Sequence, residues 1–353
     1  DTFGYNQWVL DSLRVTAALD SGGMTLRRLT AVDSARTRFR GSGHIPWESM
    51  AGRTSPNDTI SLALSARGNL LATFGRHMDS PIGGRGNGEA HIAVRGTAEG
   101  WQFTRGSIRI PEWKLKTVCF VPDGVRDYEL RGKIDDSSRV HIVMNGRIRR
   151  SPVTIYTSHD IPPGYEPIMV GPLNLGVVHV ATPEDGIEIH LPGFMAVGET
   201  GEIHFGPREP MEAFALSGPA DRVKITGTWT LRNLEFTFPL LNDETLPWDF
   251  DPFPYATWEL DIKPGNRKVV YFWDLRGKRN KFMRFFEGTV DLTSLVQIRG
   301  RMRDETFRIE GRAEAHRGAV YFGKVFDHNV DVGVEFVPRP LPERGYDNLP
   351  IIQ

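Results

Sequence analysis

The residue types that most often carry chemistry are present in this sequence, but they are not grouped as a catalytic or metal site requires. The ten histidines are scattered along 353 residues. His141 and His190 lie next to Val140 and Ile189, in the polar phase of alternating segments, so we expect their imidazoles to face solvent. The sequence has no C-x-x-C, H-E-x-x-H or EF-hand pattern. It therefore predicts neither a metal site nor another cofactor.

Two short motifs resemble parts of enzyme sites only in outline. The glycine cluster Gly83–Gly88 lacks the G-K-[ST] ending of a phosphate-binding loop, so we expect an ordinary loop there. Asp135 and Asp136 have the residue types of a glycosidase pair, but they fall in the turn Ile134–Ser138, where Asp is favoured because it hydrogen-bonds nearby backbone. No G-x-S-x-G nucleophile elbow is present. We predict that the chain is not an enzyme.

The charge balance of the chain gives no indication of a nucleic-acid-binding protein. There are 43 Lys and Arg against 44 Asp and Glu, a formal net charge of -1, so no overall field attracts nucleic acid, and we expect no nucleic-acid partner. Most basic residues are arginines, whose guanidinium forks onto phosphate, so contact with lipid headgroups stays open. The single cysteine, Cys119, lies in an apolar run and forms no intramolecular disulfide.

The ends and hydropathy of the chain indicate a piece of a longer protein. No run approaches the roughly 18 apolar residues that a membrane-spanning helix needs. The sequence begins Asp1-Thr2-Phe3 without methionine or the pattern of a signal peptide. We interpret it as a fragment of a longer polypeptide.

Alternation of apolar and polar residues dominates the chain and predicts half-buried β-strands, as in Ile60–Ala66, Val140–Met144, Ile187–Leu191 and Val330–Phe336. The gaps are short and rich in glycine, which suits tight antiparallel turns such as Asp20–Gly23 and Pro183–Gly186. We therefore predict an all-β fold, a long antiparallel meander of consecutive strands. Helix is expected only in short pieces, with candidates at Asn6–Leu13 and Arg276–Phe286.

One segment interrupts this pattern. Leu246–Tyr255 contains three prolines, which exclude a central strand, and the basic stretch Arg276–Lys281 follows it. We predict an elongated antiparallel β-sheet region over residues 1–245, an interruption rich in proline, aromatic and basic residues over 246–286, and a continuation of the sheet over 287–353.

The apolar phase of the alternation is expected to share one face of the sheet, because a one-residue slip would move a whole strand to the other face. That face either closes on itself as a stacked β-sandwich or stays open as a hydrophobic groove, and the sequence allows both. The residues predicted to line it are Leu62, Leu64, Ile92, Val94, Ile108, Ile110, Ile142, Ile187, Ile189, Ile203, Phe205, Ile225, Trp229, Phe236, Ile298, Ile309, Val332 and Val334.

Three stretches resemble the TamB family of bacterial envelope proteins, which is grouped with the AsmA-like, bridge-like lipid carriers. The first is the strand pair in Leu13–Leu29, followed by the glycine turn in Arg40–Pro46. The others are Ile60–Gly68 and Gly311–Asp327, the latter similar to strands near the C-terminal region of that family. The order of these stretches along the chain follows the family.

This resemblance implies a sheet curled into a U-shaped trough, apolar inside and polar outside, that spans the periplasm. It implies that phospholipid is conducted along the groove between inner and outer membranes to support outer-membrane assembly. It also implies anchoring in the inner membrane by a segment not present in this sequence, and an outer-membrane barrel protein of the TamA type as a partner.

Two other functions remain alternatives. A non-catalytic β-sandwich module that binds carbohydrate or protein fits the alternation equally well, although its eight tryptophans are dispersed rather than grouped. A β-structured hydrolase or lyase acting on polysaccharide would need a carboxylate or histidine constellation, and the sequence assembles none.

Overall fold

The structure is a computed structural model of the chain. It describes residues 3–5, 8–51, 59–75, 84–97, 100–115, 125–170, 172–189, 201–204, 214–219, 222–238, 256–266, 269–274, 284–301, 306–322, 325–341, 346–347 and 351–352. Strands make up most of these residues, so the predicted all-β class is confirmed. Among the helices in this part of the chain, none has the length and hydropathy to cross a membrane.

The chain forms two compact units. The first comprises Asp1–Val118, Asp123–Arg147 and Thr154–Val178, and the second comprises Cys119–Pro122, Ile148–Val153 and His179–Gln353. This division lies elsewhere in the chain than the interruption predicted over residues 246–286. Much of that segment, residues 246–255 and 275–283, lies outside the described residues, so its role as a boundary stays a prediction.

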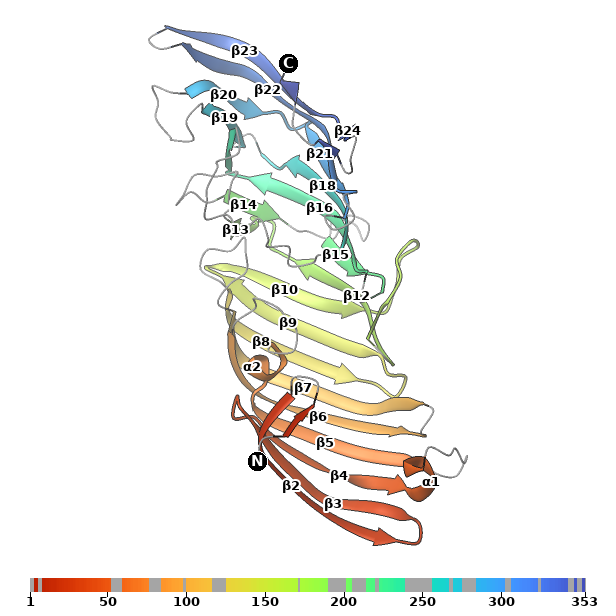
Figure 1. The fold of residues 1–353 in the computed structure, drawn as a ribbon. Helices are drawn as coiled ribbons and strands as arrows, with labels where there is room; N and C mark the ends of the chain where they lie inside the picture. Colours follow the sequence, from red (N-terminus) through yellow and green to blue (C-terminus); the bar gives the residue numbers. More distant parts are fainter. Residues whose placement is uncertain are drawn as a thin grey trace. The chain divides into compact units, whose positions relative to one another are not determined.

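The first unit is built on a row of long strands that lie side by side in chain order (Figure 1). Its elements are β1 (Phe3–Tyr5), β2 (Trp8–Asp20), β3 (Gly23–Asp33), β4 (Arg38–Pro46), α1 (Trp47–Met50), β5 (Ile60–Asn69), α2 (Leu70–Gly75), β6 (Gly84–Gly96), β7 (Trp101–Leu115), β8 (Val125–Ile134), most of β9 (Val140–Ile148) and β10 (Ser151–Ser158), β11 (Ile168–Val170) and most of β12 (Leu173–Ala181).

The predicted meander is confirmed in this unit, where each strand from β2 to β9 pairs antiparallel with the next. Aspartates hold two of its turns. Oδ1 of Asp20 accepts hydrogen bonds from the backbone N–H of Gly22 at 2.8 Å and of Gly23 at 3.2 Å. Oδ1 of Asp135 accepts from Ser137 N and Arg139 N, both at 2.9 Å, which confirms that this carboxylate serves the turn. Such Asx turns favour direct strand reversal.

A buried polar network ties α2 to the turn between β3 and β4. The carboxylate of Asp33, 6% exposed, accepts hydrogen bonds from Thr37 N at 2.8 Å and from the Thr73 hydroxyl at 2.7 Å. The hydroxyls of Thr37 and Thr73 lie 2.8 Å apart. A buried carboxylate is tolerated only when its oxygens are hydrogen-bonded, so these contacts fix α2 against the sheet.

The strands of the second unit are shorter and often interrupted. Those after β12 are β13 (Ile187–Ile189), β14 (Gly201–His204), β15 (Phe214–Ser217), β16 (Lys224–Arg232), β17 (Glu235–Phe238), β18 (Thr257–Pro264), β19 (Val270–Asp274), β20 (Arg284–Val290), β21 (Leu295–Gly300), β22 (Arg308–Phe322), β23 (Val325–Phe336), β24 (Arg339–Pro340), β25 (Tyr346–Asp347) and β26 (Ile351–Ile352).

The predicted consecutive antiparallel pairing is wrong in part of this unit. β16 pairs parallel with β18 over residues 224–231 and 257–264, and β17 pairs parallel with β19. Antiparallel neighbours are also non-consecutive, since β18 pairs with β21 and β20 with β22. Parallel strands need a connection of a dozen or more residues. The proline-rich stretch read as an interruption lies within residues 239–255, between β17 and β18, and is long enough to supply it.

Three local expectations need correction. Trp8–Leu13, in the helix candidate Asn6–Leu13, belongs to β2, and the described end of the second candidate, 284–286, belongs to β20. The cluster Gly83–Gly88 is not an ordinary loop, because Gly84–Gly96 forms β6. A Cβ on Gly88 would lie 2.4 Å from the carbonyl oxygen of Arg109, so glycine here allows close approach of two strands.

Candidate functional site

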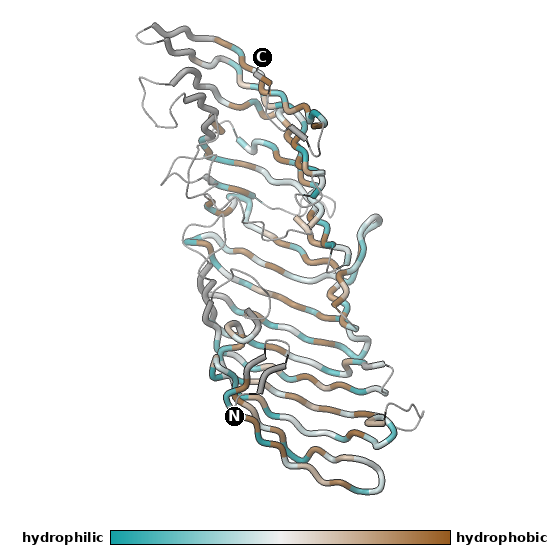
Figure 2. The backbone as a smooth tube through the Cα atoms, in the orientation of Figure 1, coloured by the Kyte–Doolittle hydropathy of each residue, from teal (hydrophilic) through white to brown (hydrophobic). Residues whose placement is uncertain are grey.

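Strand registers separate the alternating residues of the first unit onto two faces. One cross-strand row contains Val15, Leu29, Gly41, Leu64, Ile92, Gly106, Ile134 and Val140, and the next contains Leu13, Ala31, Phe39, Ala66, Ala90, Ile108, Gly132 and Ile142. We call the face carrying these rows the apolar face. Residues between them along each strand form the polar face, and Figure 2 shows hydrophobic and hydrophilic positions alternating along these strands.

Large side chains on the apolar face lie beside glycines on neighbouring strands. A Cβ on Gly41 would lie 2.8 Å from Leu64 Cδ2, and one on Gly106 would lie 2.6 Å from Ile134 Cδ1. The aliphatic side chains therefore lean over glycine backbone and occupy the space that a side chain would take. This packing hides part of each large residue within the layer of strands itself.

The apolar face of the first unit is nevertheless incompletely buried. Of the seven predicted groove residues in this unit, Ile110 is buried at 2% exposure and Leu64 is 42% exposed. The other five are half-buried: Leu62, Ile92, Val94, Ile108 and Ile142. Leu13 and Val15 of β2 are 42% and 53% exposed on the same face. Contiguous apolar surface of this kind is uncommon on soluble proteins and often marks an interaction site.

The corresponding face of the second unit is largely covered. Its registers also bring the predicted residues together, for example Ile187 opposite Ile203 and Ile298 opposite Ile309. Five of them are buried: Ile187, Ile189, Ile203, Ile225 and Val334. Trp229, Ile298, Ile309 and Val332 are half-buried. Phe205 lies outside the described residues, and the structure describes the strand but not the side chain of Phe236.

Ile225 lies at the centre of this covered region. It forms a buried cluster with Ala256 and Leu260, against which Trp229 and Trp258 pack. Side chains buried in this way form a packed core, and no acyl chain can reach them without opening the unit. At the same phase of the alternation, more of the predicted residues are therefore buried in the second unit than in the first.

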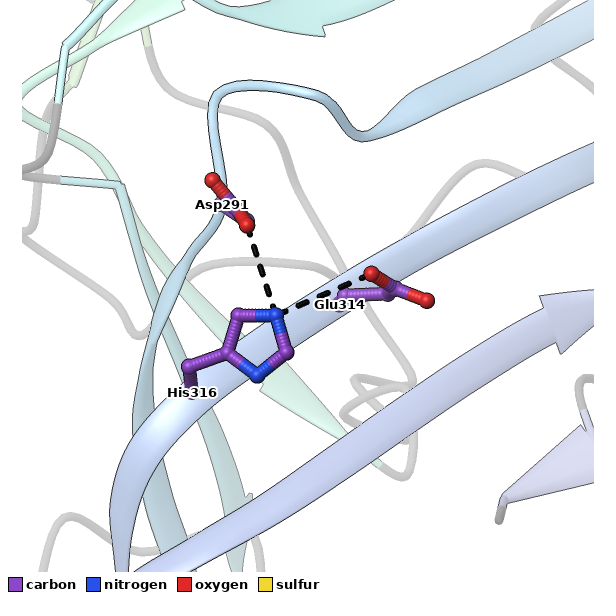
Figure 3. Close-up of side chains that lie close together, drawn as sticks. All are labelled: Asp291, Glu314 and His316. Carbon is purple, nitrogen blue, oxygen red and sulfur yellow. Dashed lines mark ion pairs between the residues drawn. The ribbon is translucent and has the colours of Figure 1, made fainter.

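One cluster of metal-ligating residue types occurs among the described residues, at the junction of β20, β21 and β22. Figure 3 shows one ring nitrogen of His316 facing the carboxylates of both Asp291 and Glu314. His316 Nε2 lies 3.4 Å from Asp291 Oδ2 and 3.8 Å from Glu314 Oε2, while its Nδ1 lies 3.2 Å from Asp331 Oδ1. The Arg312 guanidinium lies 2.8 Å from Glu314. We interpret the cluster as an ion-pair network that links neighbouring strands.

His179, a buried histidine of the second unit, has a perturbed pKa. Burial lowers the pKa of His179, which is 7% exposed, because the charged imidazolium is poorly solvated there. The predicted solvent-facing position of His141 is confirmed, since its side chain is 50% exposed. His190 lies outside the described residues.

Comparisons with protein-family models, with curated proteins and with solved structures found no match for this chain.

Proposed function

We propose that this chain is a non-catalytic lipid carrier that binds acyl chains along the apolar face of its first unit. The observation that supports this proposal is the continuous apolar face across β2–β9, on which Leu13, Val15 and Leu64 are exposed. Covering such a face with hydrocarbon is favourable, because each buried methylene contributes about 0.8 kcal/mol.

The geometry of the face suits a ligand that slides. Neighbouring strands lie about 4.8 Å apart, so an acyl chain that lies along one cross-strand row meets another residue of that row at every strand. Because the aliphatic residues lean over glycines, the rows offer similar contacts and few deep pockets. A ligand held by many equivalent contacts can move along the face without losing all of them at once.

We propose further, following the TamB-like sequence pattern, that the sheet curls into a trough that conducts phospholipid between the inner and outer membranes of a bacterial envelope. In this proposal the chain is part of a longer protein anchored in the inner membrane, and an outer-membrane barrel protein of the TamA type receives the lipid. The sealed core of the second unit favours a supporting role for that unit rather than a continuous groove through it.

Two matched substitutions on β5 test acyl-chain binding. Leu64 lies on the apolar face and Ser61 on the polar face, and both are exposed. Leu64→Glu should weaken binding of a fluorescent fatty acid at least tenfold, whereas Ser61→Glu should leave it within twofold. Phospholipid that copurifies with the chain, measured by mass spectrometry, should fall in the same order. Equal binding by both variants, or no bound lipid in the unsubstituted chain, would contradict the proposal.

A further inference from the structure

The polar face of the first unit contains a basic hollow that the acyl-chain proposal does not use. It has a volume of about 690 Å³ and is lined by residues of β3 to β7. Its basic side chains come from Arg27, Arg28, Arg40, His91 and Arg105. Gly41, Leu64 and Ile92 also line the hollow. Their neighbours Arg40, Ser65 and His91 are in the other phase of the alternation, so the basic side chains lie on the opposite face of the sheet from the side chains of Leu64 and Ile92.

Two β-bulges place arginines at opposite ends of the hollow. In β3, Thr16 pairs with Arg28 and Ala17 with Leu26, so Arg27 is an extra residue. Arg27 and Arg28 are both exposed, while Leu26 is buried on the apolar face. Bulges of this kind redirect side chains and are frequent next to functional sites.

The second bulge lies in β7. Ala93 pairs with Arg105 and Val94 with Phe103, so Thr104 is the extra residue. Thr104 and Arg105 are both exposed. The two bulges therefore place basic side chains at the two ends of one cross-strand row, with Arg28 at the β3 end and Arg105 at the β7 end.

Small residues form the floor between these ends. Ser42, Ala63 and Ala93 follow one another across β4, β5 and β6. The adjacent row adds Ser65 and Ser107 around Arg40 and His91. The hollow exists because short side chains line the middle of a face on which long basic side chains line the ends.

The arginines of the hollow lack the acidic partners that other arginines on this face have. Arg131 Nε lies 2.7 Å from Glu129 Oε1, and Arg109 lies 3.8 Å from the same carboxylate. Within the part of the chain that the structure describes, no carboxylate lies within ion-pair distance of Arg28, Arg40 or Arg105. Several like charges gathered without counter-charges create a local positive potential that attracts anions.

We propose that this hollow binds an anion that carries two or more phosphate groups. A guanidinium forks onto a phosphate through two parallel hydrogen bonds, so arginine side chains suit such a ligand. Arg28 and Arg105 stand four strand spacings apart, roughly 19 Å between backbones. One phosphate contacts one end of such a site, whereas two or more linked phosphates engage both ends. The phosphates belong either to a soluble polyphosphorylated molecule or to a lipid headgroup.

Calorimetry with inorganic tripolyphosphate tests the soluble source, using the 353-residue chain at low salt. Flotation with phosphatidylcholine vesicles, with and without a bisphosphorylated lipid, tests the headgroup source. The double variant R28Q/R105Q should weaken binding at least tenfold. The control R67Q/R109Q removes the same charge from the same face, in the row beyond Arg40 and His91, and should change binding less than threefold. An independent check is Ala63→Leu, which fills the exposed floor of the hollow and keeps every charge.

Binding of tripolyphosphate that is lost in R28Q/R105Q and Ala63→Leu supports a site for soluble ligands. Binding only to vesicles with the phosphorylated lipid, lost in the same variants, supports the same chemistry with a membrane source. Equal weakening by both double variants would show a diffuse field rather than a site, and would overturn the proposal. Absence of binding to either probe would overturn it as well. Unchanged melting temperatures exclude unfolding as the cause of any loss.

Discussion

A carboxylate introduced in the second unit should destabilise the protein far more than one introduced at the same phase in the first unit. The side chain of Ile225 is 0% exposed, and that of Leu64 is 42% exposed. Ile225→Asp loses about 1.5–3 kcal/mol of apolar burial. It also places a carboxylate without a cationic partner in the cluster with Ala256 and Leu260, which costs several kcal/mol more. The total, about 5 kcal/mol or more, approaches the whole stability of a typical domain.

Leu64→Asp should lower the free energy of unfolding by about 2 kcal/mol or less, because the new carboxylate reaches water and only part of the leucine side chain was buried. Urea unfolding followed by circular dichroism measures the difference, and tryptophan fluorescence reports on the Ile225 cluster, against which Trp229 and Trp258 pack. Ile225→Val, expected to cost about 1 kcal/mol, controls for the loss of volume. Similar losses for the two aspartate variants would refute the distinction between an open and a sealed face.

Three further outcomes are expected from local contacts. Thr73→Val should lower the free energy of unfolding by about 1–3 kcal/mol, measured by urea denaturation, because it removes the 2.7 Å hydrogen bond to the buried Asp33 carboxylate. Gly106→Ala should cost about 1–3 kcal/mol by overpacking against Ile134, and Ile134→Ala in the same chain should relieve part of that cost. Because burial lowers the folded-state pKa of His179, the unfolded chain binds its proton first as the pH falls below the ordinary value of 6.5. Stability should therefore decrease from there toward the folded-state pKa, and thermal melts of His179→Gln between pH 7.5 and 5 should show a smaller decrease than melts of the unsubstituted chain.

The sequence predicts which residues share a face in the first unit, because successive side chains along a strand point to opposite faces of the sheet. Leu62 and Leu64 fall in one phase, and the registers pair them with Val94 and Ile92 of the same phase. Short turns of the Asp20 type likewise predict direct antiparallel reversal.

The exposure of each face and the pairing of the second unit could not be predicted in this way. Ile225 and Leu64 have similar alternating neighbours, and only the residues packed above each one distinguish core from surface. The parallel pairing of β16 with β18 depends on partners about 30 residues apart along the chain, which alternation does not specify.

The basic hollow could not be predicted from the overall charge of the chain. A net charge of -1 describes the sum over the chain and says nothing about one face of one sheet. The signal was present in the adjacent residues Arg27 and Arg28, which break the alternation between Leu26 and Leu29. Two polar residues between apolar ones in a strand indicate a bulge, and a bulge with two arginines indicates a local basic site.

Photocrosslinking along β5 and β6 tests the acyl-chain proposal most directly. A photoreactive amino acid is placed in turn at positions 61–64 and 91–94, and the chain is exposed to phospholipid whose acyl chains are isotopically labelled. The proposal predicts crosslinks with a period of two, strong at Leu62, Leu64, Ile92 and Val94 and weak at the four positions between them. Crosslinks of equal strength at all eight positions, or at none, would contradict binding of lipid to the apolar face.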